Sequence, residues 1–336
     1  MILMACLALA GCSRKQSTTI PIQITVVETA ETKDQAQIEA EALGLLSTTN
    51  FAGLDALAAK YRDSKEAYAD GSAKLVYVYD GLAVSDEDPE GMWIFRQKQI
   101  QGWMNACPES AAARIAMARF LCDYAWKARG GGYANTVTDE GWKLMGERLN
   151  QAAQTLRSAR DLNGGGPVYW SSLLRVSLGL QVEKADYNSF FNEAVKEYPY
   201  YVPYYQVRAT YLLPRWYGEE GEWQKDLTRS ADQISGEGGD MIYAQTVWTM
   251  HHYGEGINVF EGQGISWDRV DRGFGGILKQ FPDSIAAKNE RANLAALAGD
   301  AAKAREYFQD MNGQVDLCQW SDTNEVTKAI NWAFSH

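Results

Sequence analysis

The acidic residues of one short segment are the first candidates for chemistry in this sequence. Glu219, Glu220 and Glu222 stand between Trp216 and Trp223. Carboxylates beside aromatic rings are typical of sites that bind or cleave glycans, in which two carboxyl groups stand roughly 5 to 9 Å apart across the bond. Neighbours on one loop rarely hold that geometry. A glycan-binding or glycan-cleaving site is therefore kept as the alternative to the leading prediction.

Other catalytic and cofactor patterns are weak or missing. Glu109-Ser110 resembles the catalytic Glu-Ser of lytic transglycosylases, but their Gly-Leu-Met-Gln signature is missing, and Pro-Glu-Ser also suits a helix N-terminus. The histidines are His251, His252 and His336, and adjacent histidines point to different sides of a helix. No P-loop, zinc-protease or nucleophile-elbow motif occurs in the sequence. We therefore expect a protein that is not an enzyme and holds no cofactor or metal.

Composition narrows the class of partner. The chain has 336 residues and 46% hydrophobic content, enough for one large or two ordinary domains with a real core. It carries 32 basic and 43 acidic residues, a net charge of −11, and no basic block follows Lys15. This balance argues against nucleic acid or an anionic lipid surface as the main partner.

The first residues predict a processing signal. MILMACLALAGC is apolar, but its apolar stretch is about half of the ~20 residues that cross a bilayer, which is typical of a secretory signal. Leu9-Ala10-Gly11-Cys12 resembles the lipobox of bacterial lipoproteins, in which the peptide is cut before a cysteine that then carries lipid. No Lys or Arg precedes the apolar run, which departs from that pattern. A fortuitous apolar terminus on a cytosolic protein is the alternative.

The lipobox resemblance implies a lipid-anchored protein of the bacterial cell envelope. Residues 1–11 would be the signal peptide, and lipid on Cys12 would make the only contact with a membrane. Ser13 resembles the residue found in cargo of the outer membrane, facing the periplasm. Residues 12–33 would form a flexible tether. Alternating apolar residues in it leave room for one short strand that docks on the body: Ile20, Ile22, Ile24 and Val26.

Three cysteines would remain in a compartment that permits disulfides: Cys107, Cys122 and Cys318. A helix over residues 109–122 would separate the first two by roughly 20 Å. This exceeds the reach of a disulfide. Free thiols are predicted, and a bridge to Cys318 stays open.

Three prolines set the expected architecture. Pro108, Pro199 and Pro282 each have an apolar residue eight positions earlier and an alanine ten positions later. Helices usually end just before a proline, which is welcome in the first turn of the next helix. Each proline is therefore predicted to lie between two helices that approach closely at the alanine. The apolar residues and alanines are Ile100, Phe191, Phe274, Ala118, Ala209 and Ala292.

This spacing resembles the tetratricopeptide repeat, a helix-turn-helix unit of ~34 residues. The match is best at residues 282–308, where Ala292, Ala304 and Phe308 occupy the small and aromatic positions of that family. The resemblance implies an all-α fold, a degenerate array of αα-hairpins (an α-solenoid) with one short N-terminal strand as an option. The array would cover residues 34–336, and a subdivision near 163–167 is left open.

A second resemblance covers more of the chain. Residues 50–82, from NFAGLDALAAKYRD to VYVYDGL, and residues 211–223, YLLPRWYGEEGEW, are similar to a bacterial helical family known only as a domain of unknown function. Its hallmark is Pro-Arg/Lys-Trp followed closely by Gly, here Pro214-Arg215-Trp216 and Gly218. That family supplies no activity and supports the helical fold.

The repeat resemblance also implies where a partner binds. In such arrays the first helix of each unit lines a concave groove. Carried over position by position, the groove residues are Ile115, Arg119, Gln206, Thr210, Asn289 and Asn293. Asn289 and Asn293 resemble asparagines that hold a peptide backbone or terminal carboxylate, and Arg119 would add positive charge; a solvated helix face is the alternative. The leading prediction is a non-catalytic scaffold that binds a protein or peptide partner.

The segment 198–218 is unusually rich in tyrosine and tryptophan. Together with Trp223 it predicts either an aromatic patch for binding or packing between helices, and packing is the favoured interpretation. The residues of this aromatic patch are Tyr201, Tyr205, Trp216 and Trp223. Arg215 is expected to stack on a ring or to pair with one of the neighbouring glutamates.

Overall fold

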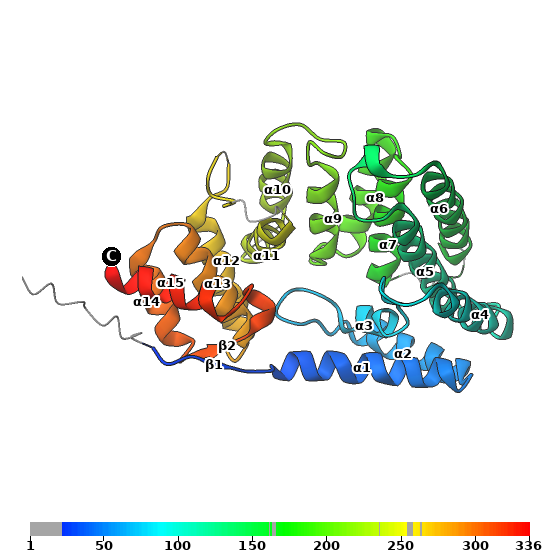
Figure 1. Ribbon diagram of the computed structural model, residues 1–336, viewed down its shortest axis with the longest axis horizontal. Helices are drawn as coiled ribbons and strands as arrows, with labels where there is room; N and C mark the ends of the chain where they lie inside the picture. Colours follow the sequence, from blue (N-terminus) through cyan, green and yellow to red (C-terminus); the bar gives the residue numbers. More distant parts are fainter. Residues whose placement is uncertain (1–21, 161, 163–165, 235, 254–257, 263) are drawn as a thin grey trace, which may run out of the picture.

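The computed structural model describes residues 22–160, 162, 166–234, 236–253, 258–262 and 264–336, which form an array of helices (Figure 1). In chain order the helices are α1 (Ala30–Ser47), α2 (Phe51–Ser64), α3 (Lys74–Asp80), α4 (Glu90–Ala106), α5 (Ala111–Arg129), η1 (Ala134–Thr136), α6 (Asp139–Arg160), α7 (Gly166–Gly179), α8 (Lys184–Glu197), α9 (Pro203–Tyr211), α10 (Glu222–Asp232), α11 (Gly238–Tyr253), α12 (Trp267–Gln280), α13 (Ile285–Leu297), α14 (Ala301–Asp310), η2 (Leu317–Gln319) and α15 (Thr323–Ser335). The strands are β1 (Thr25–Val26) and β2 (Gln314–Val315). The prediction of an all-α array with one short N-terminal strand is confirmed. The expected signal peptide and Cys12 lie outside the described residues.

The predicted proline turns are confirmed. Pro108 lies between α4 and α5, Pro199 between α8 and α9, and Pro282 between α12 and α13. The residue before each proline has left helical geometry, yet its N–H still bonds to the carbonyl four residues earlier. These residues share one backbone shape: Cys107 (φ −124°, ψ 72°), Tyr198 (φ −136°, ψ 74°) and Phe281 (φ −127°, ψ 67°). The same local rule therefore ends a helix and starts the next at three places.

The residues that flank these turns are buried, as the spacing predicts. They are Ile100, Phe191, Phe274, Ala118, Ala209 and Ala292. A serine caps the helix that follows in two of the units: the Ser110 hydroxyl accepts from the Ala113 N–H, and the Ser284 hydroxyl accepts from the Ala287 N–H. Glu109 and Ser110 therefore stand at the start of α5, where Ser110 caps the helix, as the helix-start interpretation of Pro-Glu-Ser predicts.

An N-terminal arm, residues 22–47, closes the array. Its strand β1 pairs in parallel with β2, and Ile22 and Ile24 pack into the C-terminal hydrophobic cluster around Phe308. The part of the predicted tether that the structure describes is therefore packed on the body. From β1, helix α1 runs along the open side of an arch made by the later helices and contacts α2, α3 and α4 (Figure 1).

The α2–α3 loop, residues 65–73, brings the N-terminal region against the middle of the array. Gly71 has a φ of +77°, and a β-carbon there would lie 2.3 Å from the Val202 Cγ2 atom. Only glycine satisfies both the backbone conformation and this close approach. The Gln245 side chain of α11 donates to the Ala69 carbonyl in the same loop. Helices distant in sequence thus meet at one central place.

The interior is largely one hydrophobic cluster. It includes buried residues on both sides of residues 163–167, such as Leu156 and Val168. Cys107, Cys122 and Cys318 are free thiols; Cys122 is buried and Cys318 is exposed. Within the described parts of the chain, no helix combines the length and the apolar character needed to cross a bilayer.

Candidate functional site

A central cavity of about 400 Å³ lies where the N-terminal region meets α9, α11 and α13. Its walls hold four carboxyl groups, several neutral polar side chains, and the aromatic side chains of Tyr77 and Trp248. We call it the acidic cavity, after its carboxyl groups: Glu31, Asp70, Glu290 and Asp316. No lysine or arginine is among the described residues that line it.

Burial and neighbouring negative charges raise the pKa of two of the carboxyl groups, Glu31 and Glu290. Burial, helped by the charge of Asp70, raises the pKa of Glu31 above its usual value. Burial also raises the pKa of Glu290 well above its usual value, and the charges of Asp70 and Asp316 add to this effect. Both shifts have the same physical cause, which is the cost of placing a negative charge away from water and near other negative charges.

Glu290 is the most unusual of the four. Its side chain faces the acidic cavity and the residue is only 4% exposed. Among the described residues its carboxyl group makes no hydrogen bond and no ion pair, whereas Asp70 accepts from Ser72 and Asp316 accepts from the Cys318 N–H. Buried carboxyl groups are normally paired or hydrogen-bonded, because an unpaired one costs stability. Glu290 therefore marks a place where a partner group is needed.

The neutral side chains of the acidic cavity are also oriented to accept hydrogen bonds. The Gln206 amide donates to the Thr249 hydroxyl at 2.8 Å, and the Gln245 amide donates to the Ala69 carbonyl. The side-chain carbonyls of both glutamines accept no hydrogen bond from the described residues. With the carboxylates and the ring of Trp248 they form a wall that suits an ammonium or guanidinium group.

The acidic residues of this wall do not form a metal-binding cluster by the geometry of the described residues. The part of the chain that the structure describes contains no group of three or more His, Cys, Asp or Glu side chains placed to hold one. The four carboxyl groups line the same space. Their arrangement fits a larger cation that carries several hydrogen-bond donors.

Of the predicted groove residues, Gln206 lines the acidic cavity and the others do not. Arg119 forms an ion pair with Asp80, and its guanidinium carbon lies 5.9 Å from the centre of the Tyr79 ring. Ile115 is buried in the core. The Thr210 hydroxyl donates to the Gln206 carbonyl of its own helix at 3.0 Å. These three positions face the array itself.

The two predicted asparagines lie in the interior. Asn289 uses its whole amide within the fold: it donates to the carbonyls of Ile285 and Gln314, and accepts from the Asp316 N–H and the Trp320 indole. Asn293 is buried and donates to the Gln319 carbonyl at 3.3 Å. Both hold the segment 314–320 on α13, so neither presents its amide to a ligand in this structure. Glu290, between them in sequence, is the charged residue of that helix that lines the acidic cavity.

The predicted aromatic patch is mostly core. Tyr201, Tyr205 and Trp223 are buried, and the Tyr205 hydroxyl donates to the Pro199 carbonyl at 2.7 Å. These three residues pack between helices, which is the interpretation that the sequence favoured. Trp216 differs, because it lines a second hollow.

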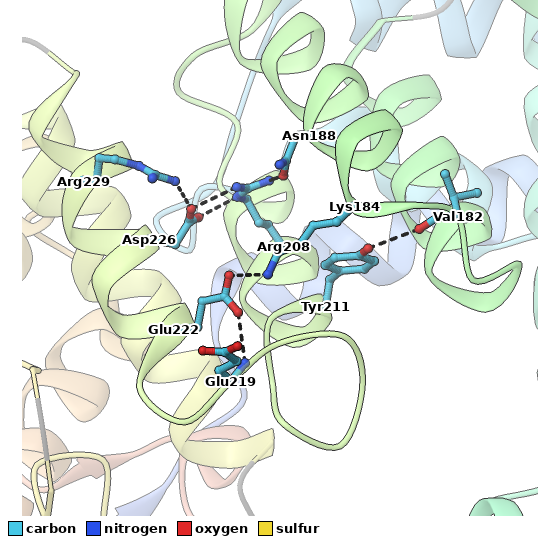
Figure 2. A network of polar contacts seen from close by, with 9 residues as sticks. All are labelled: Val182, Lys184, Asn188, Arg208, Tyr211, Glu219, Glu222, Asp226 and Arg229. Atoms are coloured by element: carbon cyan, nitrogen blue, oxygen red, sulfur yellow. Dashed lines mark hydrogen bonds and ion pairs between the residues drawn. The ribbon is translucent and has the colours of Figure 1, made fainter.

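Two of the glutamates beside these tryptophans, Glu219 and Glu222, meet at the start of α10 (Figure 2). The Glu222 carboxylate accepts from the Glu219 N–H at 2.9 Å and forms an ion pair with Lys184. Glu219 and Glu220 are exposed. Arg215 pairs with none of them: its guanidinium carbon lies 4.8 Å from the centre of the Tyr253 ring. The stacking alternative for Arg215 is the observed one.

Part of the chain matches a protein family whose activity is not known. Residues 39–177 match the model of a family described as a domain of unknown function (DUF4034). The predicted resemblance is confirmed over this range. The range includes residues 50–82, but the Pro214-Arg215-Trp216 hallmark lies outside it.

No match was found among curated proteins. Among solved structures, the crystal structure of yeast Tom70 is similar over 85% of this chain and 59% of the yeast chain. The sequences are 14% identical and the TM-score is 0.35. This chain therefore spans less than two thirds of the yeast chain.

Proposed function

We propose that this protein is a non-catalytic helical-repeat scaffold, which binds a protein or peptide partner by holding a basic group of that partner in the acidic cavity. The observation that carries the proposal is Glu290, a buried carboxyl group without a partner among the described residues, facing a space with three further carboxyl groups. The basic group is a lysine or arginine side chain, or a terminal amino group. The volume of about 400 Å³ suits one such group and not a folded domain.

The physical basis is charge compensation. A cation in the acidic cavity would give Glu290 the counter-charge that burial otherwise denies it, and would reduce repulsion among the carboxyl groups. Because the pKa of Glu290 is raised in the free protein, binding of a cation is coupled to the loss of a proton. Affinity for a basic peptide should therefore rise with pH until Glu290 is ionised without the ligand.

The test compares Glu290→Gln with Glu306→Gln, the same chemical change at an exposed position of α14. Each full-length protein is used to select from a library of random peptides, and binding of the selected peptides is measured by fluorescence anisotropy. The wild type and Glu306→Gln should enrich lysine or arginine at one position. Acetylation of the selected lysine, or Glu290→Gln in the protein, should weaken binding about tenfold or more, because a charged hydrogen bond is lost.

Two results would overturn the proposal. One is a selection that enriches no basic residue. The other is a basic peptide that binds Glu290→Gln as tightly as the wild type. Circular dichroism of both variants checks that each is folded.

Lipid anchoring is a second part of the proposal and rests on sequence alone. We infer from Leu9-Ala10-Gly11-Cys12 that Cys12 carries lipid and holds the scaffold at the bacterial outer membrane, facing the periplasm. Cys12→Ala should then release the protein from washed membranes into the soluble fraction. Unchanged membrane association of Cys12→Ala would contradict this inference.

A further inference from the structure

A second hollow, of about 1000 Å³, lies between the C-terminal end of α5, the start of α6, the α9–α10 loop and the end of α11. The hallmark residues Arg215 and Trp216 line it. We call it the basic cavity, and define it by three cations and three indole rings: Lys127, Arg129, Arg215, Trp126, Trp142 and Trp216. It shares no lining residue with the acidic cavity.

The three cations of the basic cavity have no acidic partner. None of them forms an ion pair with a described carboxylate, and Asp86 is the only acidic residue among the described residues that line the cavity. Their hydrogen bonds within the described residues go to backbone carbonyls of adjoining segments. In a chain with a net charge of −11, three such cations around one hollow form a site of positive potential.

The indole rings further restrict the chemical class of the ligand. The Arg129 guanidinium carbon lies 5.7, 5.5 and 5.9 Å from the ring centres of Trp126, Trp142 and Trp216. Rings arranged like this usually bind a cationic ligand. Here the protein's own arginine takes that position, so a ligand of the basic cavity is not a cation.

The hydrogen-bonding groups that remain free are donors. The indole N–H groups of Trp126 and Trp216 and the Nε–H of Arg129 are buried and make no hydrogen bond within the described residues. Buried donors of this kind are normally satisfied. Because these atoms are out of reach of a ligand in the hollow, the cations that line it select the ligand, and they call for a negatively charged one.

The rim of the basic cavity is aromatic and open. Tyr133 is 80% exposed, and Tyr253 and Trp142 are also partly exposed. Trp126 and Trp216 meet edge to face, with ring planes at 89°, and so leave no parallel slot for a flat base. Exposed rings along an open hollow suit the apolar C–H faces of sugar rings.

We propose that the basic cavity binds an acidic saccharide, whose carboxylate pairs with Arg129 and Arg215 and whose ring packs on the aromatic rim. The carboxylate supplies the missing counter-charge, and the sugar ring packs its C–H face on the exposed rings of the rim. This site is independent of the acidic cavity and of the basic partner proposed for it.

The test measures tryptophan fluorescence of the full-length protein during titration with trigalacturonic acid. Maltotriose serves as the neutral probe and ADP as the nucleotide probe. The dissociation constant from the fluorescence titration should be at least tenfold lower for the acidic trisaccharide than for maltotriose. Added salt should weaken binding of the acidic trisaccharide. Arg215→Gln should weaken binding of the trisaccharide about tenfold, because a charged hydrogen bond is lost. Arg215 is exposed, so its substitution leaves the core intact.

Two control variants separate this proposal from the others. Arg157→Gln, an exposed arginine of α6, makes the same change in charge and should bind the trisaccharide as the wild type does. Glu290→Gln should also bind it normally, because the two cavities are separate. Absence of binding, equal binding of maltotriose, binding of ADP in place of the saccharide, or unchanged binding by Arg215→Gln would each overturn the proposal.

Discussion

The ion pair between Arg208 and Asp226 joins α9 to α10 and should be a principal support of the middle of the array (Figure 2). The guanidinium donates to the carboxylate twice, with Nε–Oδ2 and Nη2–Oδ1 distances of 2.5 and 2.9 Å. The two side chains are 8% and 9% exposed. Arg208 also donates to the Asn188 side chain of α8 at 2.9 Å, and its guanidinium carbon lies 4.3 Å from the Phe191 ring centre.

Asp226→Asn removes the charge and keeps the shape of the side chain. Arg208 would then be a buried cation without a counter-charge, a change that typically costs about 3–5 kcal/mol. Unfolding entropy is ~2.1 cal/mol/K per residue, or about 0.7 kcal/mol/K for 336 residues, so the melting temperature should fall by about 4–7 °C.

Thermal and urea unfolding, followed by circular dichroism, measure this change. The matched control is Arg229→Gln, because Arg229 contacts the same carboxylate but its side chain is 65% exposed. A surface pair of that kind contributes only ~0–1 kcal/mol. The double variant Arg208→Met/Asp226→Leu removes both charges and should recover most of the loss. If Asp226→Asn costs no more than Arg229→Gln, water screens the pair and the reasoning fails.

Three further predictions concern stability and thiol reactivity. The raised pKa of Glu290 means that the folded state binds this proton more tightly than the unfolded state, so the contribution of Glu290 to stability is present below the unfolded pKa and is lost as pH rises through the folded pKa. In urea unfolding, Glu290→Gln should be more stable than the wild type at pH 8, and this advantage should shrink toward pH 4. A difference that stays constant with pH would refute this. Gly71→Ala should lower stability and speed hydrogen exchange in residues 65–73, because of its φ of +77° and its crowded Cβ position, whereas Gly44→Ala, with open space around it in α1, should stabilise by up to about 1 kcal/mol. Native protein at pH 7.5 should react with a disulfide reagent at exposed Cys318 and not at Cys122, whose pKa burial raises to about 11; mass spectrometry of the labelled peptides locates the site, and labelled Cys122 would show that the core opens.

The proline turns could be predicted because their cause is local. A proline restricts the residue before it, and a buried apolar residue and alanine at fixed distances mark the faces that pack. The same holds for β1, whose alternating residues were visible in the sequence. The capping role of Ser110 was visible as well, because a cap involves only residues within one turn.

The acidic residues of the proposed site could not be predicted from the sequence, because their environment comes from distant segments. Asn289 and Asn293 stand on the predicted helix, but residues 314–320 cover them and use their amides. Glu290 gave no signal of its own in the sequence, because Lys288 and Arg291 are charged residues of the same helix. Its neighbour in space, Asp70, is more than two hundred positions away in the sequence.

The sequence alone determined the all-α class and the three proline turns, because proline geometry and apolar spacing act over short distances. Only the tertiary structure decided which charges stay unpaired. Four carboxyl groups gather in one cavity because the N-terminal region packs against α9, α11 and α13, and three cations gather around another where α5, α6, α11 and the α9–α10 loop meet. Compensation of charge depends on distances in space, and sequence spacing does not encode those distances.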